Sequence, residues 1–162
     1  MELTCVQGGA HERLYGATTA RFREALDTAV ALALPELSKE RRRPTRAWLN
    51  ENRAGNYNGK HSHGSGFSGV YYVIVPGEER YDENAGANRS REGCLAMCTR
   101  LLEEDTGGCG GHFSLIRPVA GMLLLFPSVL EHAVLPFYDA ACNSDTHPAA
   151  PGPSRISVAF NI

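Results

Sequence analysis

Three histidines are the side chains whose types and spacing could support metal chemistry. His61 and His63 form a His-x-His pair, and side chains two residues apart on an extended strand point to the same side, about 6–7 Å apart. His132 lies far along the chain, shortly after the strongly apolar run 121–127. Imidazoles from two strand ends would form a facial metal site with open coordination positions. The sequence therefore predicts a three-histidine metal site, although His132 taken alone also fits a buried structural histidine.

The segment 155–162 carries a second group of side chains that could do chemistry. Its polar and apolar residues alternate with a period of two, which indicates a strand. One face carries Arg155 and Ser157 and is polar and small, which favours a pocket lining. Arg155 considered alone also fits a surface arginine at the start of a strand. The opposite, apolar face consists of Ile156, Val158, Phe160 and Ile162.

Four segments, taken in order, resemble the iron(II)- and 2-oxoglutarate-dependent oxygenases, and in particular their small "putative 2OG-Fe(II) oxygenase" group with a His-x-His motif. These segments are 58–63, 68–73, 121–132 and 155–161, and the resemblance covers residues 48–162. It implies a dioxygenase that uses Fe(II), O2 and 2-oxoglutarate as cosubstrate. The implied reaction is hydroxylation of an unidentified small-molecule or protein substrate.

The resemblance also implies roles for individual residues. The implied metal ligands are His61, His63 and His132. The second of them stands where the superfamily usually has a carboxylate. Arg155 matches the basic residue that pairs with the far carboxylate of 2-oxoglutarate, and a guanidinium suits this role because it makes a planar, two-pronged contact. Ser157 and Tyr72 match residues that lie beside that carboxylate.

Two other functions fit the same residues. A cupin-type dioxygenase would use the three histidines without 2-oxoglutarate, and Arg155 would then be dispensable and could face solvent. A non-catalytic jelly-roll module would bind a metal or a partner, and its histidines would not need to converge. Asp82 and Glu83 could replace the absent carboxylate ligand, although no spacing in their loop favours this.

The elements that position these residues are predicted to be mostly strands. Apolar residues at helical spacing between Phe22 and Ala33 predict an amphipathic helix that ends near Pro35. Residues 52–59 have turn composition, and a short helix is expected over 92–104. The predicted strands are 45–50, 67–75, 112–118, 121–127, 131–137 and 155–162.

This order of elements predicts a mainly β fold, a double-stranded β-helix of the jelly-roll or cupin-like kind, with the N-terminal helix packed on the major sheet. One domain is expected, in which 1–44 is a helical support segment and 45–162 is the jelly-roll oxygenase core. The loops within 77–111 and 139–153 would then shape the mouth of the site.

The composition argues against several classes of protein. Of the 162 residues, 43% are hydrophobic and 21% are charged, which excludes disorder as the overall state. A formal net charge of −2 argues against a nucleic-acid groove. We find neither an apolar run of about 18 residues, as a membrane span needs, nor a basic and then apolar start, as a secretory signal needs. The five cysteines are expected to be reduced thiols. These features predict an intracellular, cytoplasmic protein.

Overall fold

A computed structural model describes residues 3–7, 10–14, 17–38, 44–64, 66–77, 91–98, 113–138 and 153–162 of the chain. Most of the two loop segments that were expected to shape the mouth of the site lies outside these residues. Asp82 and Glu83, the possible substitute carboxylates, also lie outside them. Within the described part, no helix combines the length and the hydropathy that a membrane span requires.

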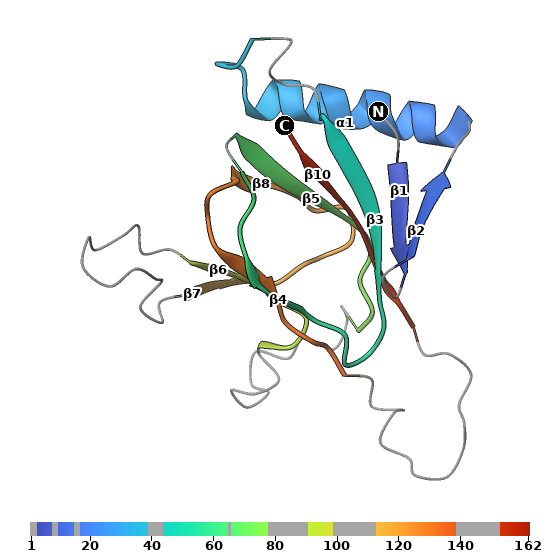
Figure 1. Cartoon of the computed structure of the whole chain (residues 1–162), viewed down its shortest axis with the longest axis vertical. Helices are drawn as coiled ribbons and strands as arrows, with labels where there is room; N and C mark the ends of the chain where they lie inside the picture. The colour runs from blue at the N-terminus through green and yellow to red at the C-terminus, as the bar shows by residue number, and fades with distance from the viewer. Residues whose placement is uncertain are drawn as a thin grey trace, which may run out of the picture.

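The described strands form a larger and a smaller sheet (Figure 1). The larger sheet has the order β2 (Ala10–Leu14), β1 (Leu3–Gln7), β3 (Arg46–Asn52), β10 (Arg155–Asn161), β5 (Phe67–Ile74), β8 (Leu123–Pro127). The smaller sheet has the order β4 (Asn58–His61), β9 (His132–Val134), β6 (Leu95–Cys98), β7 (Phe113–Ile116). All these pairings are antiparallel except that of β1 with β3. The predicted mainly β, double-stranded β-helix fold is confirmed.

The single helix of the described chain, α1 (Ala17–Ala33), covers one face of the larger sheet (Figure 1). Its apolar stripe is buried through Leu26 and Val30, which pack against Val158 and Phe160 of β10. These side chains form a core cluster because each element offers one apolar face to the other. The predicted packing of the N-terminal helix on the major sheet is therefore confirmed.

The opposite face of β10 points between the two sheets. Alternation along the strand sends Arg155 and Ser157 to this face, and both are buried. The pairing register places Ser157 between Asn50 of β3 and Tyr72 of β5. Tyr71, the neighbour of Tyr72, instead contacts Phe22 of the helix, with ring centroids 5.6 Å apart. The larger sheet thus separates an apolar layer under α1 from a polar layer that faces the smaller sheet.

Two segments have a different secondary structure from the one expected, and a third, the predicted turn 52–59, overlaps the start of β4. The part of 1–44 before the helix, predicted only as helical support, also supplies the β1–β2 hairpin, and β1 extends the larger sheet beside β3. The helix predicted over 92–104 is wrong over its described part, because Leu95–Cys98 forms strand β6 between β9 and β7. All four side chains of β6 are buried, and periodicity does not separate such a short apolar run from a buried helix.

The cysteines also depart from the expectation of reduced thiols throughout. Cys98 takes part in a disulfide, whereas Cys94 does not and is a buried thiol. The close spacing of the two residues carried no information on this difference. On β6 and the turn before it, both side chains are packed inside the protein.

Candidate metal centre

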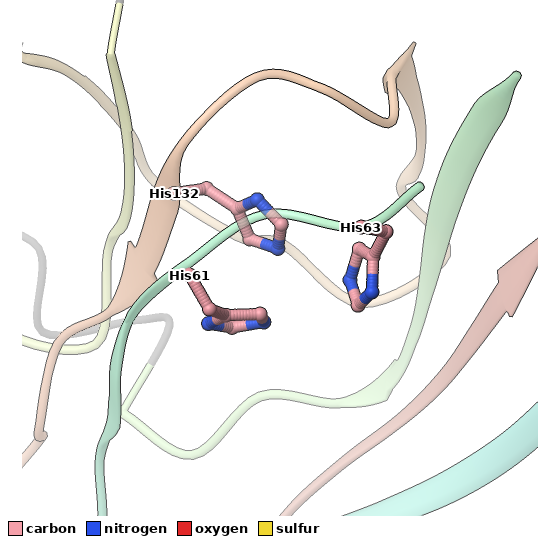
Figure 2. Close-up of side chains that lie close together, drawn as sticks. All are labelled: His61, His63 and His132. Atoms are coloured by element: carbon pink, nitrogen blue, oxygen red, sulfur yellow. The ribbon is translucent and has the colours of Figure 1, made fainter. Parts of the chain in front are cut away.

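Three imidazoles converge at one end of the space between the sheets (Figure 2). His61 ends β4 and His132 begins β9, and the two residues are direct partners in the antiparallel pairing of these strands. Their ring centroids lie 4.3 Å apart. His63 follows β4 by two residues, and its ring centroid lies 5.2 Å from each of the other two. The ligand atoms of the three side chains all lie within 4.8 Å of one another.

Backbone carbonyls orient two of these rings. Nδ1 of His61 lies 2.7 Å from the carbonyl oxygen of Gly59, and Nδ1 of His132 lies 2.9 Å from that of Leu130. A carbonyl oxygen only accepts, so Nδ1 must carry the proton in both rings. Nε2 then keeps its lone pair and is free to coordinate a metal, an arrangement common among metal-binding histidines.

His63 is held in place by the turn between β8 and β9. Its backbone N–H donates to the carbonyl oxygen of Ser128 at 2.8 Å. Ser128 is itself fixed, because its hydroxyl lies 2.8 Å from that of Ser68, and both side chains are buried. The ring of Trp48 lies beside that of His63, at 6.0 Å between centroids. Contacts with β3, β5 and the β8–β9 turn therefore fix the third imidazole.

Burial favours the neutral form of two of the imidazoles, those of His132 and His63. Desolvation lowers the pKa of His132, and the neighbouring His61 and His63 lower it further, against the opposing effect of the Leu130 carbonyl. The pKa of His63 is also lowered, first by burial and then by His61. Neutral imidazole is the form that coordinates a metal ion, so burial favours the metal-binding form of these two rings.

The donor set fits a divalent transition metal such as Fe(II). With metal–nitrogen bonds of about 2.0–2.1 Å, three ligand nitrogens on one face of an ion lie roughly 3 Å from one another. Distances of up to 4.8 Å between the ligand atoms therefore need only small side-chain movements to reach that geometry. Neutral imidazoles bind Fe(II), zinc and copper, and a three-imidazole face leaves further positions for other ligands.

A cavity of about 70 Å³ adjoins the cluster and receives side chains from both sheets. The three histidines line it together with Arg155, Ser157 and Tyr72, so all six side chains named from the sequence face one space. Their roles as metal ligands and cosubstrate contacts stay predictions. Histidines that did not converge would have favoured the non-catalytic alternative, and the three histidines do converge.

Arg155 is the charged residue of this cavity and is almost fully buried, at 1% exposure. Nη1 donates to the carbonyl oxygen of Gly93 at 2.8 Å, and the guanidinium carbon lies 5.5 Å from the centre of the Phe137 ring. These contacts fix the plane of the guanidinium. A buried cation that lines a cavity favours an anionic ligand there. The solvent-facing Arg155 of the cupin-type alternative does not occur.

Several further residues of the cavity wall were not named from the sequence as site residues, and four of them have polar or aromatic side chains on β3 and β4. Trp48, Asn50 and Asn52 alternate along β3 and all point inward, and Asn58 faces them from β4. The period-two spacing of the first three was a usable signal, but the turn composition of 52–59 concealed that Asn52 ends one strand and Asn58 begins the next. By contrast, Glu131 points away from the cluster, as its place beside His132 on a strand predicts, and its carboxylate pairs with Lys60 at 3.0 Å.

Fold and site together define a class: a double-stranded β-helix with a histidine cluster and a buried arginine between its sheets. The family described as "Putative 2OG-Fe(II) oxygenase" matches residues 46–161, and the chain belongs to this family. A crystal structure of a Pseudomonas putida prolyl-4-hydroxylase is similar at 20% sequence identity and a TM-score of 0.43. That match covers 71% of this chain and 50% of the prolyl-4-hydroxylase chain, so this chain spans half of that enzyme's length. No curated protein matches the chain.

Proposed function

We propose that the chain is an Fe(II)- and 2-oxoglutarate-dependent dioxygenase that hydroxylates a C–H bond of its substrate. The observation that carries this proposal is a buried guanidinium, that of Arg155, in the same cavity as three convergent imidazoles. Membership of the family supports the same general activity. When bound, the iron and the cosubstrate would couple oxidative decarboxylation of 2-oxoglutarate to hydroxylation of the substrate by O2.

Different residues of the cavity would bind the metal and the cosubstrate. Nε2 of His61 and of His132, with His63, would hold the metal, and the Gly59 and Leu130 carbonyls would keep two of the rings in the coordinating tautomer. Arg155 would bind the far carboxylate of 2-oxoglutarate and so set the direction in which the oxoacid end reaches the metal. The cavity walls would exclude bulk water from that ion pair, which strengthens it.

Arg155 has two neighbours suited to the same carboxylate. Ser157 follows on the same face of β10, and Tyr72 is the partner of Ser157 on β5. Both side chains are buried and can donate an O–H to a carboxylate oxygen. The negative charge missing from an all-imidazole metal site would be supplied in part by the dianionic cosubstrate.

The test is an anaerobic titration of the Fe(II)-loaded chain with 2-oxoglutarate, followed by the visible charge-transfer band of the chelate. The native chain should show a saturable band. Arg155→Ala should weaken 2-oxoglutarate binding about 10- to 150-fold, because a hydrogen bond to a charged group contributes about 1.5–3 kcal/mol. His132→Ala should lose the band through loss of iron. Arg53→Ala removes an exposed arginine outside the cavity and should leave the titration unchanged.

Loss of folding is separated from loss of binding by a second variant and a second measurement. Arg155→Lys keeps the buried positive charge but not the two-pronged contact, so it should bind 2-oxoglutarate at an intermediate strength. Iron content and unfolding temperature are measured for each variant. Bound iron without any band on addition of 2-oxoglutarate would contradict the proposal.

One observation favours a second candidate. The described cluster is made of imidazoles only, with no carboxylate ligand among the residues that the structure describes. A three-histidine dioxygenase that does not use 2-oxoglutarate fits this donor set equally well. It predicts oxygen consumption without 2-oxoglutarate and unchanged activity in Arg155→Ala.

A further inference from the structure

Three asparagines line the cavity that holds the histidines and Arg155. Asn50 and Asn52 reach it from β3, and Asn58 reaches it from β4. Each is partly buried, and within the described part of the chain no hydrogen bond engages any of the three side-chain amides. Asn56 and Asn161 differ, since their side-chain oxygens accept hydrogen bonds from the Arg53 N–H and the Ser68 hydroxyl. Inward-facing amides without protein partners indicate groups that pair with a ligand or with water.

The strand register places these amides beside, and not among, the β10 residues Arg155 and Ser157, which are proposed to bind the cosubstrate. Asn52 is the partner of Arg155, and Asn50 is the partner of Ser157, so the two amides lie one strand away, about 4.8 Å, on β3. Asn58 lies on β4, one of the two edge strands of the smaller sheet among the described strands. A ligand between β3 and β4 would therefore lie beside the cosubstrate and next to the strand that ends in His61.

The charges of the residues that line the cavity limit which chemical groups such a ligand can carry. Arg155 is the only permanently charged side chain among the described residues that line it, and no carboxylate is present among them. A cationic group would find no counterion in this wall, and the single cation already has a role. An asparagine amide offers two donors and an acceptor without charge, and its best complement is another amide.

The spacing of two of the amides further limits the chemical class of the ligand. Asn50 and Asn52 lie two residues apart on one face of β3, about 6.6–6.8 Å along the strand. Peptide groups on one side of an extended chain repeat with the same distance. An extended peptide laid along β3 would bring successive peptide groups of like orientation to both side chains. A small rigid ligand has no such repeat.

We propose that Asn50 and Asn52, with Asn58 opposite, bind the backbone amides of an extended peptide segment, and that the primary substrate is a peptide or protein. The inference rests on the proposed function and names the substrate class of the same site. The asparagines are specificity-determining residues, distinct from the predicted metal ligands and from Arg155. The substrate residue next to the histidines would be the one that is modified.

The chain contains its own reporter for this test. Trp48 is its single tryptophan and lines the cavity on the same face of β3 as Asn50. The probes are blocked tripeptides, acetyl-Ala-Xaa-Ala-amide, in which the central residue is varied over all types except tryptophan. They are titrated into the zinc-loaded full chain in the presence of 2-oxoglutarate while Trp48 emission is followed. At least one tripeptide should give a saturable change, and its analogue with an ester in place of the central amide should bind more weakly.

The asparagine variants then locate the contact. Asn50→Ala or Asn52→Ala should weaken binding of the responding tripeptide about 2- to 12-fold, the range for a neutral hydrogen bond. Asn50→Ser and Asn52→Ser keep a polar side chain in case the alanine variants are unstable, and they should also weaken binding. Asn56→Ala is the matched control, because it removes the same amide from an exposed turn outside the cavity. It should bind the tripeptide as the native chain does.

Two results overturn the inference. One is that no tripeptide gives a saturable change in Trp48 emission. The other is that the asparagine variants weaken the 2-oxoglutarate titration while tripeptide binding is unchanged, because the amides would then serve the cosubstrate. Failure of the proposed function is a separate result: the chelate band would be absent, while tripeptides would still bind in an asparagine-dependent manner.

Discussion

The orientation of the histidine rings is set within a few residues of each ring. His61 and His132 each donate Nδ1–H to the carbonyl oxygen two residues earlier, Gly59 in one case and Leu130 in the other. This contact is local: the carbonyl oxygen two residues before the histidine accepts from Nδ1–H and so fixes the tautomer of the ring.

Cys94 gives a prediction about pH at this scale. Burial raises the pKa of its thiol above the ordinary value of 9.0, and the positive charges of Arg117 and Arg155 oppose this only in part. Above about pH 9 the unfolded chain loses this proton while the native chain keeps it, so the free energy of unfolding falls as pH rises. Cys94→Ala should therefore lose less stability than the native chain between about pH 8.5 and 10.

Urea unfolding at several pH values measures this difference. Lysines and tyrosines titrate alike in both proteins, so only the difference between the two pH profiles reports on Cys94. Parallel profiles would contradict the assigned shift. Slow alkylation of Cys94 in the folded chain, read by peptide mapping, is the expected companion result because the protonated thiol is unreactive.

At the scale of elements, the sequence predicted strands well where period two or strong apolar runs were present. Residues 67–75 and 155–162 were predicted as strands and form β5 and β10. The hairpin β1–β2 was missed because its strands are short and because β1 joins the sheet through pairing with β3, a contact that no local pattern encodes. The same limit applies to β6, whose type is decided by its neighbours β9 and β7.

Gly69 shows how closely two of these strands fit. It is the partner of Phe160 across the β5–β10 pairing, and a Cβ atom at this position would collide with the Phe160 ring. Phe160 is fully buried in the core under α1, so a shift of its ring would disturb the packing of that core. Gly69→Ala should therefore lower the free energy of unfolding by about 1–3 kcal/mol.

Chemical denaturation measures this loss, and Gly59→Ala provides the control. Gly59 lies on β4, where an added Cβ meets nothing within 4 Å, and the carbonyl that orients His61 would remain. This variant should stay within about 0.5 kcal/mol of the native chain. Equal losses in the two variants would show that the contact with Phe160 is not the cause.

At the scale of the whole molecule, a bound metal ion is expected to stabilise the fold, because its ligands would come from β4, from the residues just after β4 and from β9. The cluster exists only when β4, β9 and the β8–β9 turn are assembled, so a metal ion binds the folded chain and not the unfolded one. A metal at 100 times its dissociation constant should stabilise the fold by about 2.7 kcal/mol. Thermal unfolding with Zn(II), and with Fe(II) under anaerobic conditions, should show a higher midpoint that chelation reverses.

His61→Ala should abolish this stabilisation, whereas Ser62→Ala, an exposed residue between the two histidines of the pair, should retain it. An unchanged midpoint on addition of either metal to the native chain would contradict the predicted metal site.

The site as a whole was predictable only in part. Residue type and spacing indicated the histidines, whereas Arg155 was indicated by its place on the alternating strand 155–162 and by the family resemblance. Asparagine is also a common turn residue, so the turn composition of 52–59 concealed Asn52 and Asn58, and the period-two spacing of Trp48, Asn50 and Asn52 was the local signal that went unused. Their placement depends on the register of β3 with β10, which is a property of the assembled sheet.

The position of β10 in the larger sheet has a consequence for how the protein folds. This strand follows all the others in sequence, yet it lies between β3 and β5, whose residues come far earlier in the chain. Contacts of such high sequence separation form slowly, and until they form, the inner edges of β3 and β5 remain open to wrong partners. Arg155 and Ser157 arrive on the same strand that closes this gap. We therefore expect the cavity that Arg155 and the histidines line to be completed late in folding, together with the core under α1.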